Sequence, residues 1–147
     1  MRPPTLLQLL VIAVAAIGVP DGSIAADPPA FMIIVNPQNP VGAADRDFIR
    51  DAYLKKASEW GNHEVVHPID LASRFPARAR FVERVIRKTP SQLRTYWHQQ
   101  IYTGKSVPPP EFDSVADAIA YVVATKGAVA YIPADANPGA AKVIGIR

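Results

Sequence analysis

Two short, continuous apolar runs, far apart in the sequence, constrain the fold most. The first is Phe31–Val35, FMIIV, which ends at the proline-rich segment Asn36–Pro40. The second is Ala128–Ile132, which follows Gly127. Runs of this length without polar alternation, bounded by proline or glycine, are typical of strands buried on both faces. Because helices usually cover both faces of such strands, the sequence predicts an α/β domain.

Amphipathic segments between these runs predict the helices. Asp45 can cap a helix whose apolar residues recur at helical spacing as far as Tyr53. A second helix is expected to begin at Phe75-Pro76, because proline is favoured in the first helical turn. A last helix is expected from Asp113 or Ser114 to Gly127.

The helix expected after Thr89 has the clearest start signal. The sequence TPSQ places proline at the first helical position and glutamine where it can complete a capping box. Four apolar or aromatic residues then share one side of this helix, and we expect that side to be buried: Leu93, Tyr96, Trp97 and Ile101.

Two further strands complete the predicted sheet. Glu64–Ile69 is rich in β-branched residues, but Pro68 requires it to end there or to lie at a sheet edge. Lys142–Ile146, KVIGI, is the last predicted strand. The order of strands and helices predicts the fold class: an α/β domain with a small mixed β-sheet flanked by helices.

The first residues have the pattern of an export signal. Leu6–Ile17 is mostly apolar and too short to span a bilayer, which needs ~20 residues, but it suits the ~7–15 of a signal-peptide core. We expect cleavage after Ala25 or Ala26, with residues 1–25 as the signal peptide and 26–147 as one exported domain. The alternative is an uncleaved membrane anchor. The expected location is the periplasm, with membrane contact only through the signal peptide.

The residue types present exclude several kinds of chemistry. The chain has no cysteine, which excludes thiol catalysis and cysteine metal sites and suits a bacterial periplasm. No Gly-x-Ser-x-Gly motif or paired-carboxylate pattern occurs, so we do not expect an enzyme. His63 and His67 would be ~13 Å apart on an extended strand, too far to share an ion. We therefore expect no metal and no cofactor.

Basic residues are concentrated between Arg74 and Arg94. This stretch contains seven lysines and arginines and one acidic residue, Glu83. Such a cluster either attracts anions or forms a solvated helix face. Arg78 differs from its neighbours because it falls on the apolar side of its helix. It is either a salt-bridged arginine at the rim of the core or the counter-ion of a ligand. We expect no nucleic-acid partner, because the helical spacing of Trp97 favours packing over base stacking.

Four segments in order, IIVNPQNPVGAADRDFIRDAYLKK, WGNHEVVHPIDLASRFPARARFVERVI, GKSVPPP and VATKGAVAYIPADA, resemble the second lobe of the phosphate-binding proteins of ABC transporters. AYLKK at Ala52–Lys56 corresponds to IFLGK in that family, and TKGAVAYI at Thr125–Ile132 corresponds to TPGAIGYV. The resemblance implies one lobe of a type II periplasmic binding protein. The family closes two lobes over its ligand, and residues 26–147 are enough for one.

The resemblance also implies a ligand site. The family's anion loop, R-x-D-x-S-G-T-T, corresponds to Pro68–Phe75. Asp70 matches the family's aspartate, but proline stands at the basic position, Leu71 replaces a small residue and the Gly-Thr-Thr sequence is missing. The residues that could supply a different set of donors lie in and after this loop, so the implied ligand-binding residues are Asp70, Ser73, Arg74 and Arg78.

Two functions follow from this resemblance. The first is an exported solute-binding-like protein that binds phosphate or another small oxyanion for ABC-type uptake, with an ABC permease or another periplasmic protein as its partner. The alternative is a non-enzymatic accessory or protein-interaction domain that keeps the lobe fold but has lost the phosphate loop.

Overall fold

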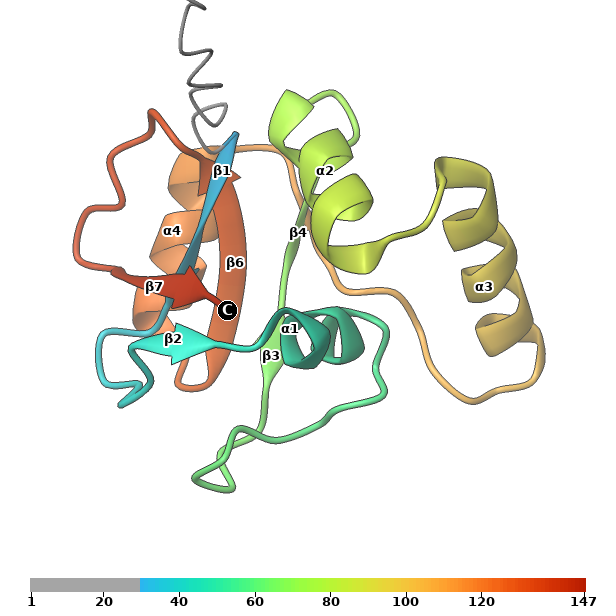
Figure 1. Cartoon of the computed structure of the whole chain (residues 1–147), viewed down its shortest axis with the longest axis horizontal. Helices are drawn as coiled ribbons and strands as arrows, with labels where there is room; N and C mark the ends of the chain where they lie inside the picture. The colour runs from blue at the N-terminus through green and yellow to red at the C-terminus, as the bar shows by residue number, and fades with distance from the viewer. Residues whose placement is uncertain (1–29) are drawn as a thin grey trace, which may run out of the picture.

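A five-stranded mixed sheet forms the centre of the computed structural model, which describes residues 30–147 (Figure 1). The predicted signal peptide, residues 1–25, lies outside the described residues. The strands are, in spatial order, β2 (Ala43–Ala44), β7 (Lys142–Ile146), β1 (Phe31–Val35), β6 (Ala128–Pro133) and β3 (His67–Pro68).

The two apolar runs are neighbouring strands inside this sheet. β1 pairs antiparallel with β6 on one side and with β7 on the other, so that Ile33 lies opposite both Tyr131 and Ile144. β2 and β3 pair parallel with their neighbours, which makes the sheet mixed. The predicted strand at Glu64–Ile69 was too long: only His67–Pro68 pairs with β6, at the edge of the sheet, where proline removes no internal ladder bond.

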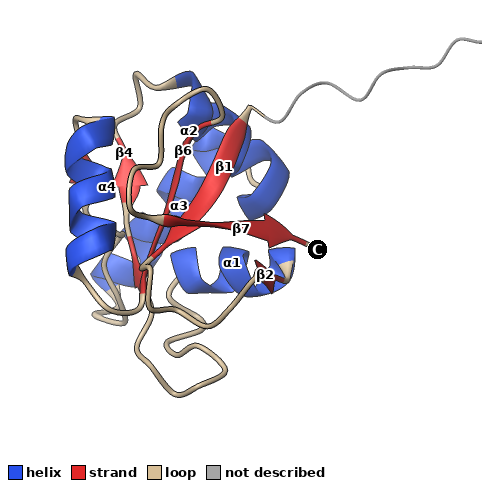
Figure 2. Ribbon diagram, turned by 90° about the vertical axis from the view of Figure 1, so that its left-hand side faces the viewer, coloured by secondary structure: helices blue, strands red, loops and turns tan. Residues whose placement is uncertain are grey.

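Helices cover the sheet, as Figure 2 shows, and the predicted fold class is confirmed. α4 lies on one side of the central strands, and α1 and α2 lie on the other. A π-helix, η1, continues α2 directly. Their bounds are α1 (Arg46–Tyr53), α2 (Pro76–Phe81), η1 (Val82–Ile86), α3 (Pro90–Tyr102) and α4 (Val115–Ala124).

Aromatic side chains join the sheet to its helices. The rings of Tyr131 on β6 and Phe81 at the end of α2 stack with their centroids 4.0 Å apart. Tyr53 from α1 and Phe31 from β1 also contact Phe81, at 4.7 and 5.5 Å. Packing of this kind places the end of α2 at a fixed position relative to β6.

A second, two-stranded ladder lies beside the main sheet and supports the candidate site. It consists of β4 (Asp70–Leu71) and β5 (Glu111–Phe112), which run parallel. The register places Asp70 opposite Glu111, although the two residues are far apart in the sequence. The N–H of Asp70 donates to the carbonyl of Pro110, which fixes the end of the proline-rich connector Pro108–Pro110 between α3 and β5.

The position of α3 differs from the prediction. Its capping box forms as expected, with Thr89 and Gln92 bonded reciprocally. Its apolar side was predicted to be buried, and this is right only in part: Leu93, Tyr96 and Trp97 are partly buried against the core, but none is fully buried, and Ile101 is 52% exposed. A cap depends on local sequence, whereas burial depends on what the rest of the chain places against the helix. In Figure 1, α3 lies at one end of the molecule, away from the sheet.

No helix among residues 30–147 is long and apolar enough to cross a membrane.

Among the glycines of residues 30–147, Gly127 should be the least tolerant of substitution. It has φ of +73°, and a Cβ added there would lie 1.9 Å from the carbonyl oxygen of Val65. Gly104 is a matched control, because its φ is +67° but nothing lies within 4 Å of an added Cβ. We expect Gly104→Ala to lower the free energy of unfolding by about 1 kcal/mol.

Gly127→Ala should cost about 2–4 kcal/mol, because it adds a clash with backbone to the same conformational cost. Chemical denaturation of both variants measures the difference. Equal destabilisation of the two variants would contradict the close approach of Val65.

Candidate functional site

A groove of about 1010 Å³ lies between the α2–η1 helix and α3. From here on it is called the groove. Its inner end contains three of the four residues implied by the sequence: Asp70, Ser73 and Arg78. They come together because β4 leads through a short loop into α2. Glu111, on the neighbouring strand β5, lines the same end.

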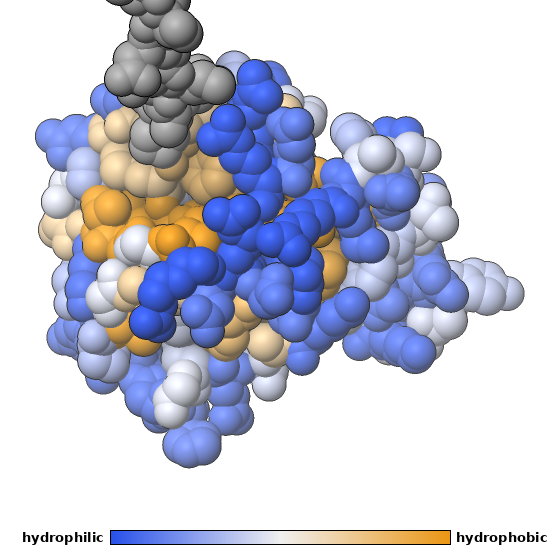
Figure 3. All heavy atoms as spheres, in the orientation of Figure 1, coloured by the Kyte–Doolittle hydropathy of each residue, from blue (hydrophilic) through white to orange (hydrophobic). Residues whose placement is uncertain are grey.

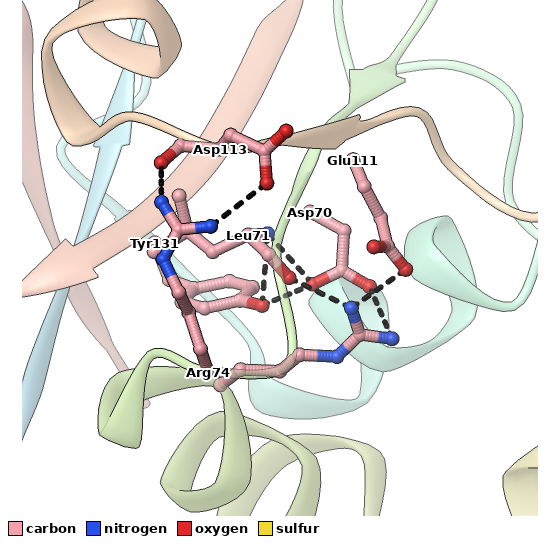
Figure 4. Close-up of polar contacts among 7 residues, drawn as sticks. Asp70, Leu71, Arg74, Glu111, Asp113 and Tyr131 are labelled. Carbon is pink, nitrogen blue, oxygen red and sulfur yellow. Dashed lines mark hydrogen bonds and ion pairs between the residues drawn. The ribbon is translucent and has the colours of Figure 1, made fainter.

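Asp70 is held by two hydrogen bonds and one ion pair (Figure 4). Its Oδ1 accepts a hydrogen bond from the hydroxyl of Tyr131 and another from the backbone N–H of Leu71, the latter at 2.9 Å. The N–H of Leu71 also donates to the Tyr131 oxygen at 3.2 Å. Oδ2 of Asp70 lies 3.4 Å from Nη2 of Arg78. The carboxylate therefore has a fixed orientation before any ligand arrives.

Arg78 lies between two carboxylates. Besides its contact with Asp70, its Nη1 donates to Oε2 of Glu111 and to the carbonyl oxygen of Leu71, both at 2.7 Å. The side chain of Arg78 is 20% exposed, while that of Glu111 is 54% exposed. Arg78 is thus salt-bridged at the rim of the core when no ligand is bound.

Burial and charge shift the protonation of these groups. Removal from water raises the pKa of Asp70, and the Tyr131 hydrogen bond and the Arg78 charge oppose this only in part. Burial also raises the pKa of Tyr131, and the negative charge of Asp70 raises it further. For Arg78, burial lowers the pKa, but the hydrogen bond to Glu111 and the charge of Asp70 outweigh it, so that the pKa is raised. Tyr131 therefore stays a hydrogen-bond donor and Arg78 stays charged.

The other two predicted residues lie differently. Ser73 is exposed at the groove and free to turn its hydroxyl toward a ligand. Arg74 points away from Asp70, as Figure 4 shows, and its Nη1 lies 2.9 Å from Oδ1 of Asp113. It also donates to the Asp113 carbonyl and lies over the ring of Phe75. The structure thus brings together Asp70, Ser73 and Arg78 but not Arg74.

Two residues of the site were missed from the sequence. Tyr131 was noted only as part of an apolar strand, although its hydroxyl is the one polar side-chain group in Ala128–Ile132. Glu111 directly follows Pro108–Pro110, and a stiff connector before a carboxylate was the only available signal. Neither signal says which strand the residue will pair with.

The outer part of the groove is apolar with basic residues around it. Leu93, Trp97 and Ile101 line it from α3. Arg87 and Arg94 also line this part. The groove therefore joins a charged inner end to an apolar wall with positive charge nearby.

Histidines and acidic residues are the side chains of this chain that could hold a metal ion. Among residues 30–147, no group of three or more histidines, cysteines or acids is close enough to hold one ion. His63 is exposed and lies 3.3 Å from Glu59, with Nδ1 facing Oε2. The inner end of the groove offers instead charge and hydrogen bonds.

Replacing Asp70 by asparagine should change the pH dependence of stability. Because the folded protein holds the Asp70 proton more tightly than the unfolded chain does, the wild type loses stability as the pH rises from about 3.8 through the raised folded pKa. Asp70→Asn lacks this loss. The stability of the variant relative to the wild type should therefore increase as the pH rises over that window. Urea denaturation at a series of pH values measures it, and a relative stability that falls with pH would contradict the expectation.

Several solved structures share this fold. One, from Clostridium perfringens, is assigned as a phosphate ABC transporter substrate-binding protein and holds bound phosphate; its TM-score is 0.62 at 16% identity. An ABC-type phosphate transport receptor from Vibrio cholerae matches with a TM-score of 0.60 at 17% identity. PstS from Borrelia burgdorferi gives 0.61 at 11% identity.

Each match covers 80% of this chain but only 44%, 46% and 47% of the three structures. The chain therefore spans less than half the length of the proteins it matches. No family model matches the sequence, and no curated protein matches it. At these identities the likeness establishes the fold and not the activity. The resemblance found in the sequence is thus confirmed for the fold: this chain folds as a single lobe similar to those of phosphate ABC transporter substrate-binding proteins.

Proposed function

We propose that this chain is an exported, single-lobe solute-binding protein, not an enzyme, and that it binds a small oxyanion such as phosphate. The observation that carries the proposal is that Asp70, Ser73 and Arg78 line the same end of one groove. The fold supports it, since one of the similar structures holds bound phosphate. Delivery to an ABC permease in the periplasm would be the corresponding role.

An anion binds by replacing Glu111 on Arg78. The Nη1 of Arg78 now donates to Glu111, whose side chain is half exposed and can turn into water. The oxyanion then receives the charge-assisted bond that Glu111 gives up, and the Ser73 hydroxyl adds a second donor. Arg74 is left out of the proposed site because its guanidinium lies on Asp113.

Asp70 makes the site selective for a protonated oxyanion. An ionised carboxylate can only accept hydrogen bonds, so it attracts the P–OH group of hydrogen phosphate and repels a fully ionised anion such as sulfate. Tyr131 and Leu71 both donate hydrogen bonds to Oδ1 of Asp70. The other oxygen, Oδ2, lies beside Arg78 and is the one left to accept a bond from the ligand.

Calorimetric titration with phosphate tests the role of the arginine. Arg78→Ala should weaken binding at least about tenfold, because a charge-assisted bond is lost. Glu111→Gln should strengthen it, because a neutral amide competes less for Arg78. Arg84→Ala is the matched control: Arg84 lies in η1, which continues the same helix, but does not line the groove, so binding should not change.

No binding heat in the wild type or in Glu111→Gln would overturn the proposal. Circular dichroism of Arg78→Ala separates loss of the site from loss of the fold.

Comparison of phosphate with sulfate tests the role of Asp70. The wild type should bind phosphate in preference to sulfate, and Asp70→Asn should reduce this preference at least about tenfold, because the repulsion of sulfate is removed. An unchanged preference in Asp70→Asn would show that the carboxylate does not select the ligand.

The second candidate is an accessory protein that has kept the lobe but not the anion site. It is favoured by one observation: two carboxylates, Asp70 and Glu111, already neutralise the charge of Arg78. The titration above separates the two functions, because this candidate predicts no phosphate binding even in Glu111→Gln.

A further inference from the structure

We propose that the groove takes a phosphate monoester that carries an aromatic or apolar group, with the phosphate at Ser73 and Arg78 and the organic group against α3. This inference rests on the proposed function, because it uses the same anion site. It goes further in naming the class of ligand, an organic phosphate, that the groove would bind more tightly than inorganic phosphate.

The first argument is size. The groove has a volume of about 1010 Å³, at the upper end of the range of roughly 300–1,000 Å³ typical of sites for small organic ligands. An inorganic oxyanion at Arg78 would contact only its inner end. The remaining space continues without interruption from Ser73 along η1 to Trp97 and Ile101, which line the same groove.

The second argument is the chemistry of the groove wall. Ile101 is 52% exposed, and Leu93 and Trp97 are partly exposed, although all three are apolar and lie on one side of α3. Figure 3 shows apolar surface between the hydrophilic side chains of α2 and those of α3. Apolar side chains gathered in a concave surface, next to a few polar groups, are characteristic of ligand sites.

Trp97 is suited to hold a flat ring. Its ring meets that of Tyr96 edge to face, with centroids 4.9 Å apart. Tyr96 is itself fixed, because its hydroxyl donates to the carbonyl oxygen of Leu54 at 2.6 Å. The orientation of Trp97 is thus set before binding, and an aromatic group in the groove can stack on it or meet its edge.

The third argument is charge. Arg87, Lys88 and Arg94 line the groove beyond its inner end, together with one acid, Glu83, which pairs with Arg80. Arg94 has no ion-pair partner among residues 30–147. These charges favour an anionic ligand. They disfavour a second copy of the chain as the occupant, because docking through this face would bring the same basic residues together.

The experiment compares four probes on the full domain: inorganic phosphate, phenyl phosphate, 1-naphthyl phosphate and 1-naphthol. We expect 1-naphthyl phosphate to bind at least about tenfold more tightly than inorganic phosphate, with phenyl phosphate between them. 1-Naphthol should bind more weakly than 1-naphthyl phosphate. Calorimetry gives the affinities. Tryptophan fluorescence reports the contact, because Trp97 lies at the groove while Trp60, the other tryptophan, is buried elsewhere.

Trp97→Ala should remove the advantage of the naphthyl ester and leave the affinity for inorganic phosphate unchanged. Tyr102→Ala is the matched control, because Tyr102 is an aromatic residue of the same helix that is 93% exposed and does not line the groove. It should bind both phosphates as the wild type does.

The outcomes separate this inference from the proposed function. If inorganic phosphate binds and the esters bind no more tightly, the inference is overturned while the proposed function holds. Tighter binding of the ester that persists in Trp97→Ala also overturns it, as does equal binding of 1-naphthol and its phosphate. Tight binding of the ester without measurable binding of inorganic phosphate supports the inference and contradicts the proposed ligand. Absence of binding by any probe overturns both.

Discussion

The rest of the structure depends on the two contacts made by Tyr131. Its ring stacks on Phe81 inside the core, and its hydroxyl donates to Asp70 at the groove. One side chain therefore joins the packing between β6 and α2 to the orientation of the candidate ligand-binding carboxylate. Because burial raises the pKa of Tyr131, the hydroxyl stays protonated and the link is kept. A substitution in the core that moves the Tyr131 ring would therefore also move its hydroxyl away from Asp70.

The charges at the inner end of the groove are paired with one another in the absence of a ligand. Arg78 bonds to Asp70, Glu111 and the carbonyl of Leu71, and these contacts connect α2 to both strands of the small ladder. Removing one partner of such a cluster costs more than the cluster contributes, because it leaves a charge uncompensated. Any anion must therefore compete with Glu111, the most exposed member. This competition sets the affinity of the lobe and makes Glu111 the residue through which it can be raised.

The outer wall of the groove belongs to the same lobe as its charged inner end. The three similar structures are more than twice as long as the part of them that this chain matches. Here α3 forms the outer wall of the groove, with its apolar side partly exposed. Contact area within the groove adds to the affinity for a ligand. An organic phosphate gains that area, whereas inorganic phosphate does not.

Sequence by itself determined the features that depend on neighbouring residues. The strands Phe31–Val35 and Lys142–Ile146, the capping box at Thr89 and the helix start at Pro76 all follow from local patterns, and the structure has them. Asp70 and Arg78 could be placed together for the same reason, since one strand-to-helix connection carries both.

Only the tertiary structure decided which distant groups complete the site. Tyr131 and Glu111 reach Asp70 across pairings that join remote parts of the chain, and no local pattern encodes such a pairing. Arg74 was assigned to the site by its position in the loop, but Asp113 holds it elsewhere. The apolar side of α3 was expected to be buried because its periodicity fits a core helix. Periodicity says which residues share a face, but the packing of the whole chain determines what that face meets, and here it meets an open groove.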